Sequence, residues 1–273
     1  MKTINLTSWC EFPAAIDTVK KEFGEYKIEG SGITYRNRVL YRGQTDSDWK
    51  LETTLERVSA RTWTILDYAQ AVVRCTPRIE TFTEKEWNTT PYEELERHLD
   101  ENPGEVALPN IPDYSFWVYL RHHGFPSPLL DWTASPLVAA FFAFADKSDS
   151  EKASIFAFVD SKMGVKGGFL GAPQINVRGP YVRTHKRHFL QQARYTICTF
   201  FKNNQHTFCS HEAVTSRGDK DQNILVKITI PRSERSKVLS NLNESNINYF
   251  TLFQSDEALI KTMAMEEIER IDL

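Results

Sequence analysis

The sequence predicts a single domain that mixes helices and strands, α/β or α+β, with a helical N-terminus and a helical insertion at about residues 57–115. The length of 273 residues allows one large domain or two small ones with a substantial core. With 41% hydrophobic and 25% charged residues, the composition is that of a globular protein. Helix-spaced and strand-spaced apolar patterns alternate along the chain, with no internal repeat.

The N-terminal elements follow from apolar spacing. Residues 9–27 carry apolar side chains at helical intervals behind Ser8, which is a good capping residue, so a helix is expected to open the chain. Residues 39–41 form a short β-prone run that leads into an Arg-Gly pair, which puts Arg42 at the end of a strand. Polar residues 45–55 predict a loop that runs into a further helix.

The middle of the chain predicts the helical insertion. Residues 80–105 contain nine acidic and two basic side chains, a charge of −7, which is typical of solvated helix and loop. Apolar and aromatic residues around Trp117 predict another helix, which ends before Gly124. Pro126 and Pro128 then favour an extended segment.

The second half of the chain alternates again. Ser135 and Pro136 are typical of a helix start, because serine caps helices and proline is tolerated in the first turn. They precede an apolar helix at residues 137–145. Two strands and two further helices follow, the strands at 153–159 and 224–230 and the helices at 233–242 and, with a weaker pattern, 263–271.

Charge is distributed unevenly along the chain. The net charge of −3, from 33 basic and 36 acidic side chains, does not indicate a nucleic-acid or acidic-membrane partner. Residues 161–205, however, carry eight basic side chains and no acidic one, interleaved with aromatic residues. That mixture can hold a phosphate backbone and stack on bases. The alternative is that the bases complement the acidic segment and the aromatic residues belong to the core. Both interpretations stay open.

Cysteine usage and hydropathy indicate a cytoplasmic protein without a membrane anchor. The four cysteines form no CxxC pair, the N-terminus lacks the apolar core of a secretory signal, and the longest apolar run, 137–145, is shorter than the roughly 20 residues that span a bilayer. No metal is expected, because Cys198, His206, Cys209 and His211 match no compact zinc spacing. Patterns for a P-loop, a Rossmann site and a nucleophile elbow are absent.

Three short polar motifs stand in apolar surroundings: LYRGQ at residues 40–44, HHGFPSPLLDWTASP at 122–136, and RHFLQQ at 187–192. In the first motif the Arg42 guanidinium beside a glycine suits a phosphate or a carboxylate, with close backbone approach. The structural alternative is that Arg42 pairs with a buried acid such as Asp131. The two interpretations are compatible, because an acid often orients a binding arginine.

The second motif places polar side chains at alternate positions: Asp131, Thr133 and Ser135. In an extended segment they share one face, next to a helix N-terminus whose N–H groups attract anions. The alternative is an ordinary N-cap formed by Ser135 and Thr133. His122 also has two interpretations: substrate contact or proton transfer, or a hydrogen bond to a backbone carbonyl that fixes the following turn.

Together with RHFLQQARYT and NINYFTLFQS, these motifs make the sequence resemble the FRG domain family from about Arg38 to about Ser255. The layout also resembles ADP-ribosyltransferases of the Arg-Ser-Glu type, which implies an α+β fold with an ADP-ribosyltransferase-like mixed or antiparallel β core in one domain, residues 1–273. In those enzymes a first-strand Arg-Gly holds NAD, a Ser/Thr-x-Ser strand leads into a helix, and a later strand begins with a catalytic Glu. The chain departs from the third element, because Gln191 and Gln192 stand where the carboxylate is expected.

The resemblance implies a role for each matching residue. Arg42 would take a phosphate or the ribose edge of NAD, and Thr133 and Ser135 would hydrogen-bond the nicotinamide ribose. Gln191 would bind the ribose 2′-hydroxyl, and Asp131 would supply the missing negative charge. The implied NAD site is Tyr41, Arg42, Gly43, Gln44, Thr133 and Ser135; the implied catalytic set is Arg42, His122, Asp131, Thr133, Ser135 and Gln191; the implied acceptor contacts are Arg183, Lys186, Arg187 and Arg194.

The expected function is that of an ADP-ribosyltransferase-like toxin or antiphage effector with NAD as its substrate. Its acceptor would be a nucleic acid, RNA before DNA, or a protein, and an antitoxin protein is a further expected partner. Two alternatives stay open. One is a non-catalytic module with an FRG fold that binds a nucleotide or a nucleic acid, and the other is a nuclease or other hydrolase that uses Asp131 and His122.

Overall fold

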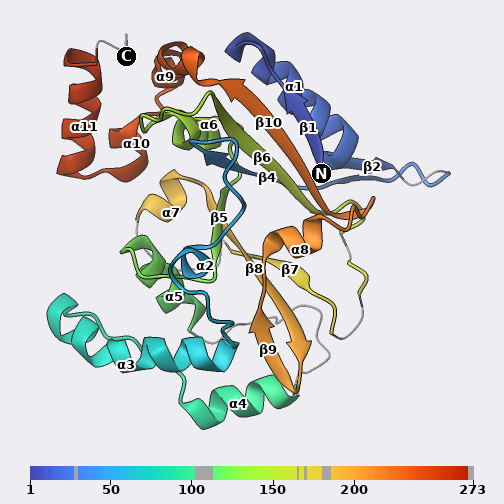
Figure 1. The fold of residues 1–273 in the computed structure, drawn as a ribbon, viewed down its shortest axis with the longest axis vertical. Coiled ribbons are helices and arrows are strands. Elements are labelled where there is room, and N and C mark those ends of the chain that lie inside the picture. Colours follow the sequence, from blue (N-terminus) through green and yellow to red (C-terminus); the bar gives the residue numbers. More distant parts are fainter. Residues whose placement is uncertain (28–29, 102–112, 165, 169–170, 180–185, 270–273) are drawn as a thin grey trace.

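The computed structural model describes residues 1–27, 30–101, 113–164, 166–168, 171–179 and 186–269. Within these residues, one eight-stranded sheet forms the centre of the molecule (Figure 1). Its strand order is β1 (Lys2–Asn5), β10 (Gln222–Pro231), β6 (Lys152–Ser161), β4 (Val39–Gln44), β5 (Leu130–Thr133), β8 (Ala193–Lys202) and β7 (Gln174–Arg178), with β9 (Gln205–Phe208) paired to β8. A separate ribbon pairs β2 (Glu25–Lys27) with β3 (Thr34–Arg36).

The sheet is mixed, which is one of the two arrangements that the resemblance implies. β1 runs parallel to β10, whereas β10, β6, β4, β5, β8 and β7 follow one another antiparallel. β4 pairs with β6 along its whole length from Val39 to Gln44, but it meets β5 where Tyr41 lies opposite Thr133. The two halves of the sheet therefore join through a short seam at Tyr41 and Thr133.

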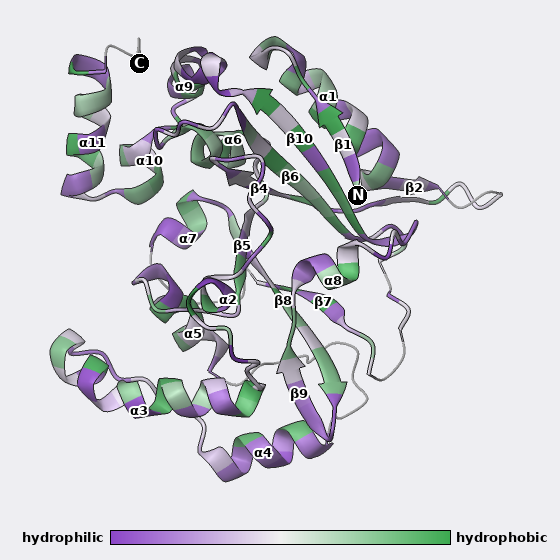
Figure 2. Cartoon of the chain, viewed as in Figure 1, coloured by the Kyte–Doolittle hydropathy of each residue, from purple (hydrophilic) through white to green (hydrophobic). Residues whose placement is uncertain are grey.

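Helices lie at both ends of this sheet (Figure 1). They are α1 (Phe12–Val19), α2 (Thr54–Val58), α3 (Ile65–Thr83), α4 (Tyr92–Glu101), α5 (Tyr114–His122), α6 (Pro136–Phe144), α7 (Lys186–Leu190), α8 (His211–Thr215), α9 (Arg235–Glu244), α10 (Tyr249–Phe253) and α11 (Asp256–Glu267), with short turns η1 (Trp9–Glu11), η2 (Lys20–Gly24) and η3 (Arg232–Glu234). Figure 2 shows that α4 is mostly hydrophilic whereas β6 is mostly hydrophobic. α4 buries Leu95 and Leu99 and exposes most of its acidic residues, which confirms that this part of the acidic segment is solvated.

Most predicted elements are found, with two corrections. The chain opens on the strand β1 rather than on a helix, because Lys2–Asn5 pairs with β10 from the far end of the sequence and shows no strand pattern of its own. The helix predicted at residues 263–271 is α11, which begins at Asp256 and ends at Glu267. Its start was hidden because Ser255 caps it without a run of buried apolar residues behind the cap.

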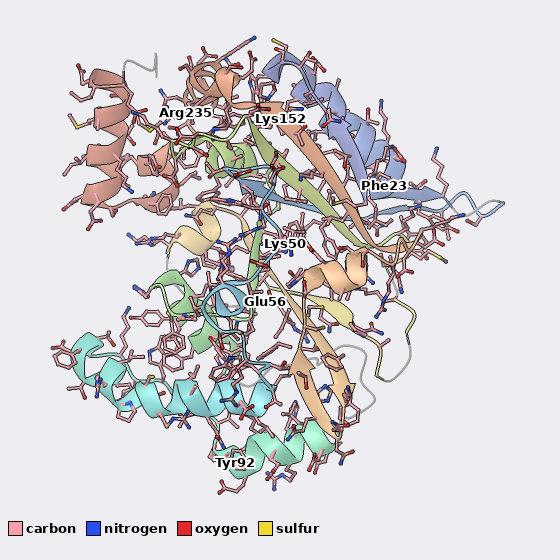
Figure 3. The ribbon with its side chains drawn as sticks, viewed as in Figure 1. Phe23, Lys50, Glu56, Tyr92, Lys152 and Arg235 are labelled. Carbon is pink, nitrogen blue, oxygen red and sulfur yellow. The ribbon has the colours of Figure 1, made fainter. Side chains whose placement is uncertain are left out.

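Helix α6 packs directly on β4, and both of its ends are capped. The Ser135 hydroxyl accepts a hydrogen bond from Val138 N at 3.3 Å, as expected of an N-cap. At the other end, Arg235 of α9 donates to Phe144 O and Ala145 O, both at 2.9 Å (Figure 3). Since α6 is buried on most sides, these caps satisfy backbone groups that water does not reach.

Gly43 allows this close packing. A Cβ atom at Gly43 would overlap the carbonyl oxygen of Ala139 and would lie 2.6 Å from the backbone nitrogen of Ala143. Both atoms belong to the α6 backbone, which cannot move aside as a flexible side chain can. The glycine of the Arg-Gly pair is therefore required because a helix lies across the strand at this point.

Aromatic packing fixes the helices on the other side of the seam. Tyr68 of α3 meets Trp117 of α5 edge to face, with ring centroids 4.8 Å apart. The Tyr68 hydroxyl donates to Pro126 O at 2.9 Å, in the extended segment that precedes β5. These contacts hold α5 and β5 next to each other.

Candidate functional site

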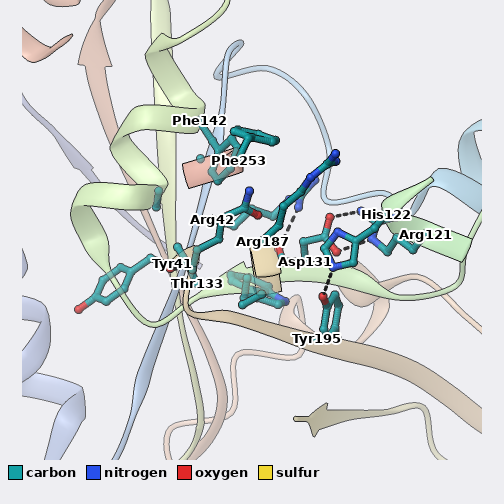
Figure 4. A pocket seen from close by; sticks show the side chains of 15 residues that line it. Tyr41, Arg42, Arg121, His122, Asp131, Thr133, Phe142, Arg187, Tyr195 and Phe253 are labelled. Carbon is teal, nitrogen blue, oxygen red and sulfur yellow. Dashed lines mark hydrogen bonds and ion pairs between the residues drawn. The ribbon is translucent and has the colours of Figure 1, made fainter. Parts of the chain in front are cut away.

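The seam between β4 and β5 opens into a cavity of about 380 Å³ (Figure 4). Residues from all three polar motifs line it, although they lie far apart in the sequence. The lining residues are Tyr41, Arg42, Gly43, Arg121, His122, Asp131, Trp132, Thr133, Ala139, Phe142, Arg187, Gln191, Ala193, Tyr195 and Phe253. The structure thus brings Arg42, His122, Asp131, Thr133 and Gln191 of the implied catalytic set to one place.

Arg42 is half-buried within β4 and faces this cavity. The expectation that it ends the strand is wrong, because the pairing with β6 continues through Gly43 to Gln44. Its Nη1 donates to the backbone oxygen of Asp131 at 2.9 Å. Burial lowers the pKa of Arg42 to about 10, partly offset by the charge of Asp131, so the guanidinium remains cationic at neutral pH. Arg42 therefore meets Asp131, as one interpretation of the sequence held, but through the main chain rather than the carboxylate.

The Asp131 carboxylate pairs with Arg121 instead. Arg121 donates from Nε and Nη2 to the two carboxylate oxygens, and its Nη1 donates to Thr54 Oγ1 at 3.0 Å. The Arg121 side chain is 9% exposed and that of Asp131 is 43% exposed, so the carboxylate faces the cavity. Burial disfavours ionisation of Asp131, but the charge and hydrogen bonds of Arg121 outweigh it and hold the pKa below its ordinary value.

His122 belongs to a hydrogen-bonded group around a buried tyrosine. Its Nε2 lies 2.8 Å from the Tyr195 hydroxyl oxygen, and His188 Nδ1 lies 3.3 Å from the same oxygen. Burial lowers the pKa of His122 to about 4, so this imidazole is neutral at pH 7. The interpretation that His122 bonds a backbone carbonyl is wrong, because its hydrogen-bond partner is the side-chain hydroxyl of Tyr195.

Thr133 and Ser135 hold the local chain together. The Thr133 hydroxyl donates to Gln191 O at 2.7 Å and accepts from Ser135 N at 3.0 Å, which ties β5 to the turn before β8. Ser135 caps α6 and is not among the lining residues. The capping interpretation of Ser135 is therefore confirmed. Thr133 lines the cavity, but its hydroxyl is hydrogen-bonded to the backbone.

Gln191 and Arg187 form the side of the cavity that faces α10. The Gln191 amide nitrogen donates to Leu252 O at 3.2 Å. The Arg187 guanidinium lies 5.4 Å from the ring centroid of Phe253, and Phe253 meets Phe142 edge to face at 6.1 Å. A cation and two aromatic rings therefore lie side by side at this end of the cavity (Figure 4).

Some residues implied for NAD binding lie elsewhere. Gln44 is buried, does not line the cavity, and donates its amide N–H to Lys50 O at 3.0 Å. Tyr41 lines the cavity, but its ring points away from Arg42 and Asp131 into the core against α6 (Figure 4). Alternation explains Tyr41, because a residue adjacent to Arg42 in a strand faces the other side of the sheet. Gln44 stands two positions from Arg42 and shares its face, but its amide is bonded to the loop at Lys50.

The implied acceptor contacts are dispersed. Arg187 lines the cavity, and Lys186 is exposed at the start of the same helix, α7. Arg194 lines a separate hollow with Arg38 on another part of the surface. Arg183 lies outside the described residues. Of the implied acceptor contacts that the structure describes, Arg187 and Arg194 therefore line two different hollows.

Seven cavity residues were not identified as site residues from the sequence: Arg121, Trp132, Ala139, Phe142, Ala193, Tyr195 and Phe253. Arg121 directly precedes His122 in the chain, but no spacing rule relates it to Asp131. Tyr195 lies in the basic stretch and Phe253 in the NINYFTLFQS segment, where both have the pattern of core residues. A clue available beforehand was that an acid in apolar surroundings, such as Asp131, needs a cationic partner.

The cavity has an excess of positive charge. Among the described residues that line it, three guanidinium groups, on Arg42, Arg121 and Arg187, stand against the single carboxylate of Asp131, while His122 is neutral. This balance favours an anionic ligand such as a phosphate or diphosphate. Over the described part of the chain, no group of three or more His, Cys, Asp or Glu side chains has a geometry that could hold a metal ion.

Comparison with known families adds one finding. Residues 37–152 match the family model of the FRG domain, which supports the FRG family for this part of the chain. The match contains β4, β5 and α6 and so the first two motifs, whereas RHFLQQ at residues 187–192 lies beyond it. No curated protein and no solved structure gives a significant match. In the described residues, no helix combines the length and the apolar character needed to cross a membrane.

Proposed function

We propose that the chain transfers ADP-ribose from NAD to a macromolecular acceptor, with the cavity at the β4–β5 seam as its active site. One observation carries this proposal: Arg42, Thr133 and Gln191 lie around a single cavity and come from β4, from β5 and from the turn into β8. β5 pairs with both β4 and β8. This is the order of elements that the resemblance to Arg-Ser-Glu ADP-ribosyltransferases implies.

The charges and rings of the cavity suit the parts of NAD. Arg42 and Arg187 offer guanidinium groups to the diphosphate, and Phe142 and Phe253 offer apolar ring surface to a flat heterocycle. In the reaction the bond between the ribose C1′ and the nicotinamide nitrogen breaks, and nicotinamide leaves with the bonding electrons. The acceptor nucleophile then forms the new bond to C1′ and loses its proton.

The positive charge that develops on the ribose needs a negative group nearby. Gln191 is neutral, so the proposal assigns this electrostatic role to Asp131, whose carboxylate faces the cavity while Arg121 fixes its orientation. A pKa held below the ordinary value keeps Asp131 ionised at neutral pH. Asp131 would act on the charge and not as a base, because the same low pKa makes it a weak proton acceptor.

RNA is the favoured acceptor. Arg187 lies at the cavity, and on the same helix the Phe189 ring is 61% exposed, so a cation and a free aromatic face are available to a phosphate and an unstacked base. Under this proposal the chain acts as a toxin or antiphage effector, and an antitoxin protein would be its partner, as the resemblance implies.

The proposal is tested by incubating the purified chain with NAD labelled in its adenylate part and with total RNA, DNA or cell protein. Label should pass to RNA, and Arg42→Ala should reduce the rate by about 100-fold or more, because the diphosphate loses the cation that positions NAD for the reaction. Arg74→Ala is the matched control, since Arg74 is exposed on α3 away from the cavity. Failure to consume NAD with any of the three acceptors would overturn the proposal.

A second function is favoured by one observation, the pairing of the Asp131 carboxylate with Arg121. Together with the neutral Gln191, it suits a module that binds a nucleotide or nucleic acid without breaking a bond. Such a module would bind NAD or ADP-ribose but release no nicotinamide. Measuring nicotinamide release alongside binding distinguishes the two functions.

A further inference from the structure

Two thiols face each other where β8 pairs with the residue that follows β9. The sulfur atoms of Cys198, on β8, and Cys209, just after β9, are 3.3 Å apart. Cys209 N donates to Cys198 O at 3.0 Å, which continues the β8–β9 pairing one step beyond Thr199 and Phe208. The two cysteines are therefore directly opposite each other across the ladder, a position in which Cβ atoms lie about 4.5–5.5 Å apart.

A covalent bond between them needs little movement. The sulfur atoms of a disulfide are about 2.05 Å apart, so each thiol has to move by roughly half an ångström or rotate slightly about its Cα–Cβ bond. Both cysteines are free thiols in this structure. Buried free cysteines usually act as small apolar residues, but two thiols directly opposite each other in a β-ladder can also be oxidised to a disulfide.

Small molecules can reach this pair. A cavity of about 230 Å³ is lined by both cysteines and, on its other walls, by Glu56 of α2 (labelled in Figure 3), Arg61 and Trp63. Cys209 is half-buried, whereas Cys198 is buried between β7 and β9. A hydroperoxide entering this cavity would meet Cys209 first.

We infer that Cys198 and Cys209 form a reversible oxidation site for hydroperoxides. The Cys209 thiol gives up its proton and the thiolate attacks one peroxide oxygen. The O–O bond breaks, the departing hydroxide takes up that proton, and the products are Cys209 sulfenic acid and water. The Cys198 thiol then attacks the Cys209 sulfur, the S–O bond breaks, and a second water leaves as the S–S bond forms. In total two thiols lose two electrons and two protons, and one hydrogen peroxide becomes two waters.

The bond would lock a hairpin that supports the rest of the fold. It would close the loop from residue 198 to residue 209, which contains the β8–β9 turn, and would hold β8 against the start of α8. Phe208 N donates to Trp63 O at 2.9 Å, so the hairpin also supports the start of α3. Oxidation should therefore make this part of the chain harder to unfold, since cross-linking restricts the unfolded state. This inference does not depend on the proposed function.

The test uses the full chain, reduced and then exposed to one equivalent of hydrogen peroxide. Titratable thiols, measured after denaturation, should fall from the four cysteines of the sequence to two. The intact mass should decrease by two hydrogens, and dithiothreitol should restore both values. Peptide mapping without reduction should join Cys198 to Cys209.

Single variants make the result specific. Cys209→Ser, a change at the half-buried member of the pair, should abolish the mass loss, whereas Cys10→Ser and Cys75→Ser should keep it. A melting temperature for Cys209→Ser close to that of the reduced wild type would show that its fold is intact. The inference is overturned if peroxide adds only oxygen to the chain, or if the cross-link found joins Cys10 or Cys75.

Discussion

Arg42 and Arg121 approach Asp131 from two sides and use different atoms of it. Arg121 holds the carboxylate, while Arg42 holds the backbone oxygen. The carboxylate therefore balances the buried charge of Arg121, and the excess positive charge of the cavity comes from Arg42 and Arg187. At the scale of single residues, the site is built around one acid that orients two arginines.

This arrangement predicts the effect of Asp131→Asn on stability. The variant leaves the nearly buried Arg121 without its counter-charge, which should lower the free energy of unfolding at pH 7 by about 2 kcal/mol, less than for a fully buried pair because Asp131 is partly exposed. Urea unfolding of wild type and variant measures the difference. Asp149→Asn, at an exposed loop position, is the matched control and should change little.

The same pair predicts a pH dependence. The folded pKa of Asp131 lies below its unfolded value of about 3.9, so the carboxylate stabilises the fold fully above that value and loses its contribution as the pH falls through the folded pKa. The gap between wild type and Asp131→Asn should therefore narrow as the pH is lowered from 7 to about 3. An equal gap at both pH values would show that the ion pair contributes nothing to stability.

At the scale of elements, the contact of α6 with β4 sets the shape of the cavity. Ala139 and Phe142 of α6 line it, and Gly43 of β4 lets the helix come close enough to do so. The caps at Ser135 and Arg235 hold both ends of the same helix. The glycine that the sequence suggests for close approach to a ligand is thus explained by the approach of a helix.

Gly43→Ala should therefore be strongly destabilising. The added methyl group meets backbone atoms of α6, and such overpacking costs about 1–3 kcal/mol or more. Gly167→Ala is the control, because a Cβ atom there meets nothing within 4 Å and the backbone is not in the left-handed region. Thermal unfolding of both variants measures the difference in their melting temperatures. Equal melting temperatures would mean that α6 does not rest on Gly43 as described.

At the scale of the whole molecule, much of the fold could be predicted because it follows local rules. The cap and proline before α6 and the alternation in β6 and β10 are read from neighbouring residues. The strand β1 could not be found in this way, because it is defined by pairing with β10 across the whole chain. Long-range pairing leaves no local pattern when the strand is short and exposed.

The candidate site also contains residues that local sequence patterns predict and residues that they do not. Five cavity residues could be chosen from the sequence, because each is a polar residue in apolar surroundings: Arg42, His122, Asp131, Thr133 and Gln191. Their partners could not be chosen, since Arg121, Tyr195 and Phe253 owe their positions to the packing of α5, β8 and α10. The net charge of −3 also concealed the site, whose lining residues are positive in total.

The proposed function requires the cavity at the β4–β5 seam to bind NAD through Arg42. Titration calorimetry of the purified chain with NAD tests it most directly, with Arg42→Ala and the control Arg74→Ala measured beside the wild type. We expect one NAD per chain, an affinity that falls at least about tenfold in Arg42→Ala through the loss of one charge-assisted contact, and no change in Arg74→Ala. Absence of binding by the wild type, or equal affinity in the wild type and Arg42→Ala, would contradict it.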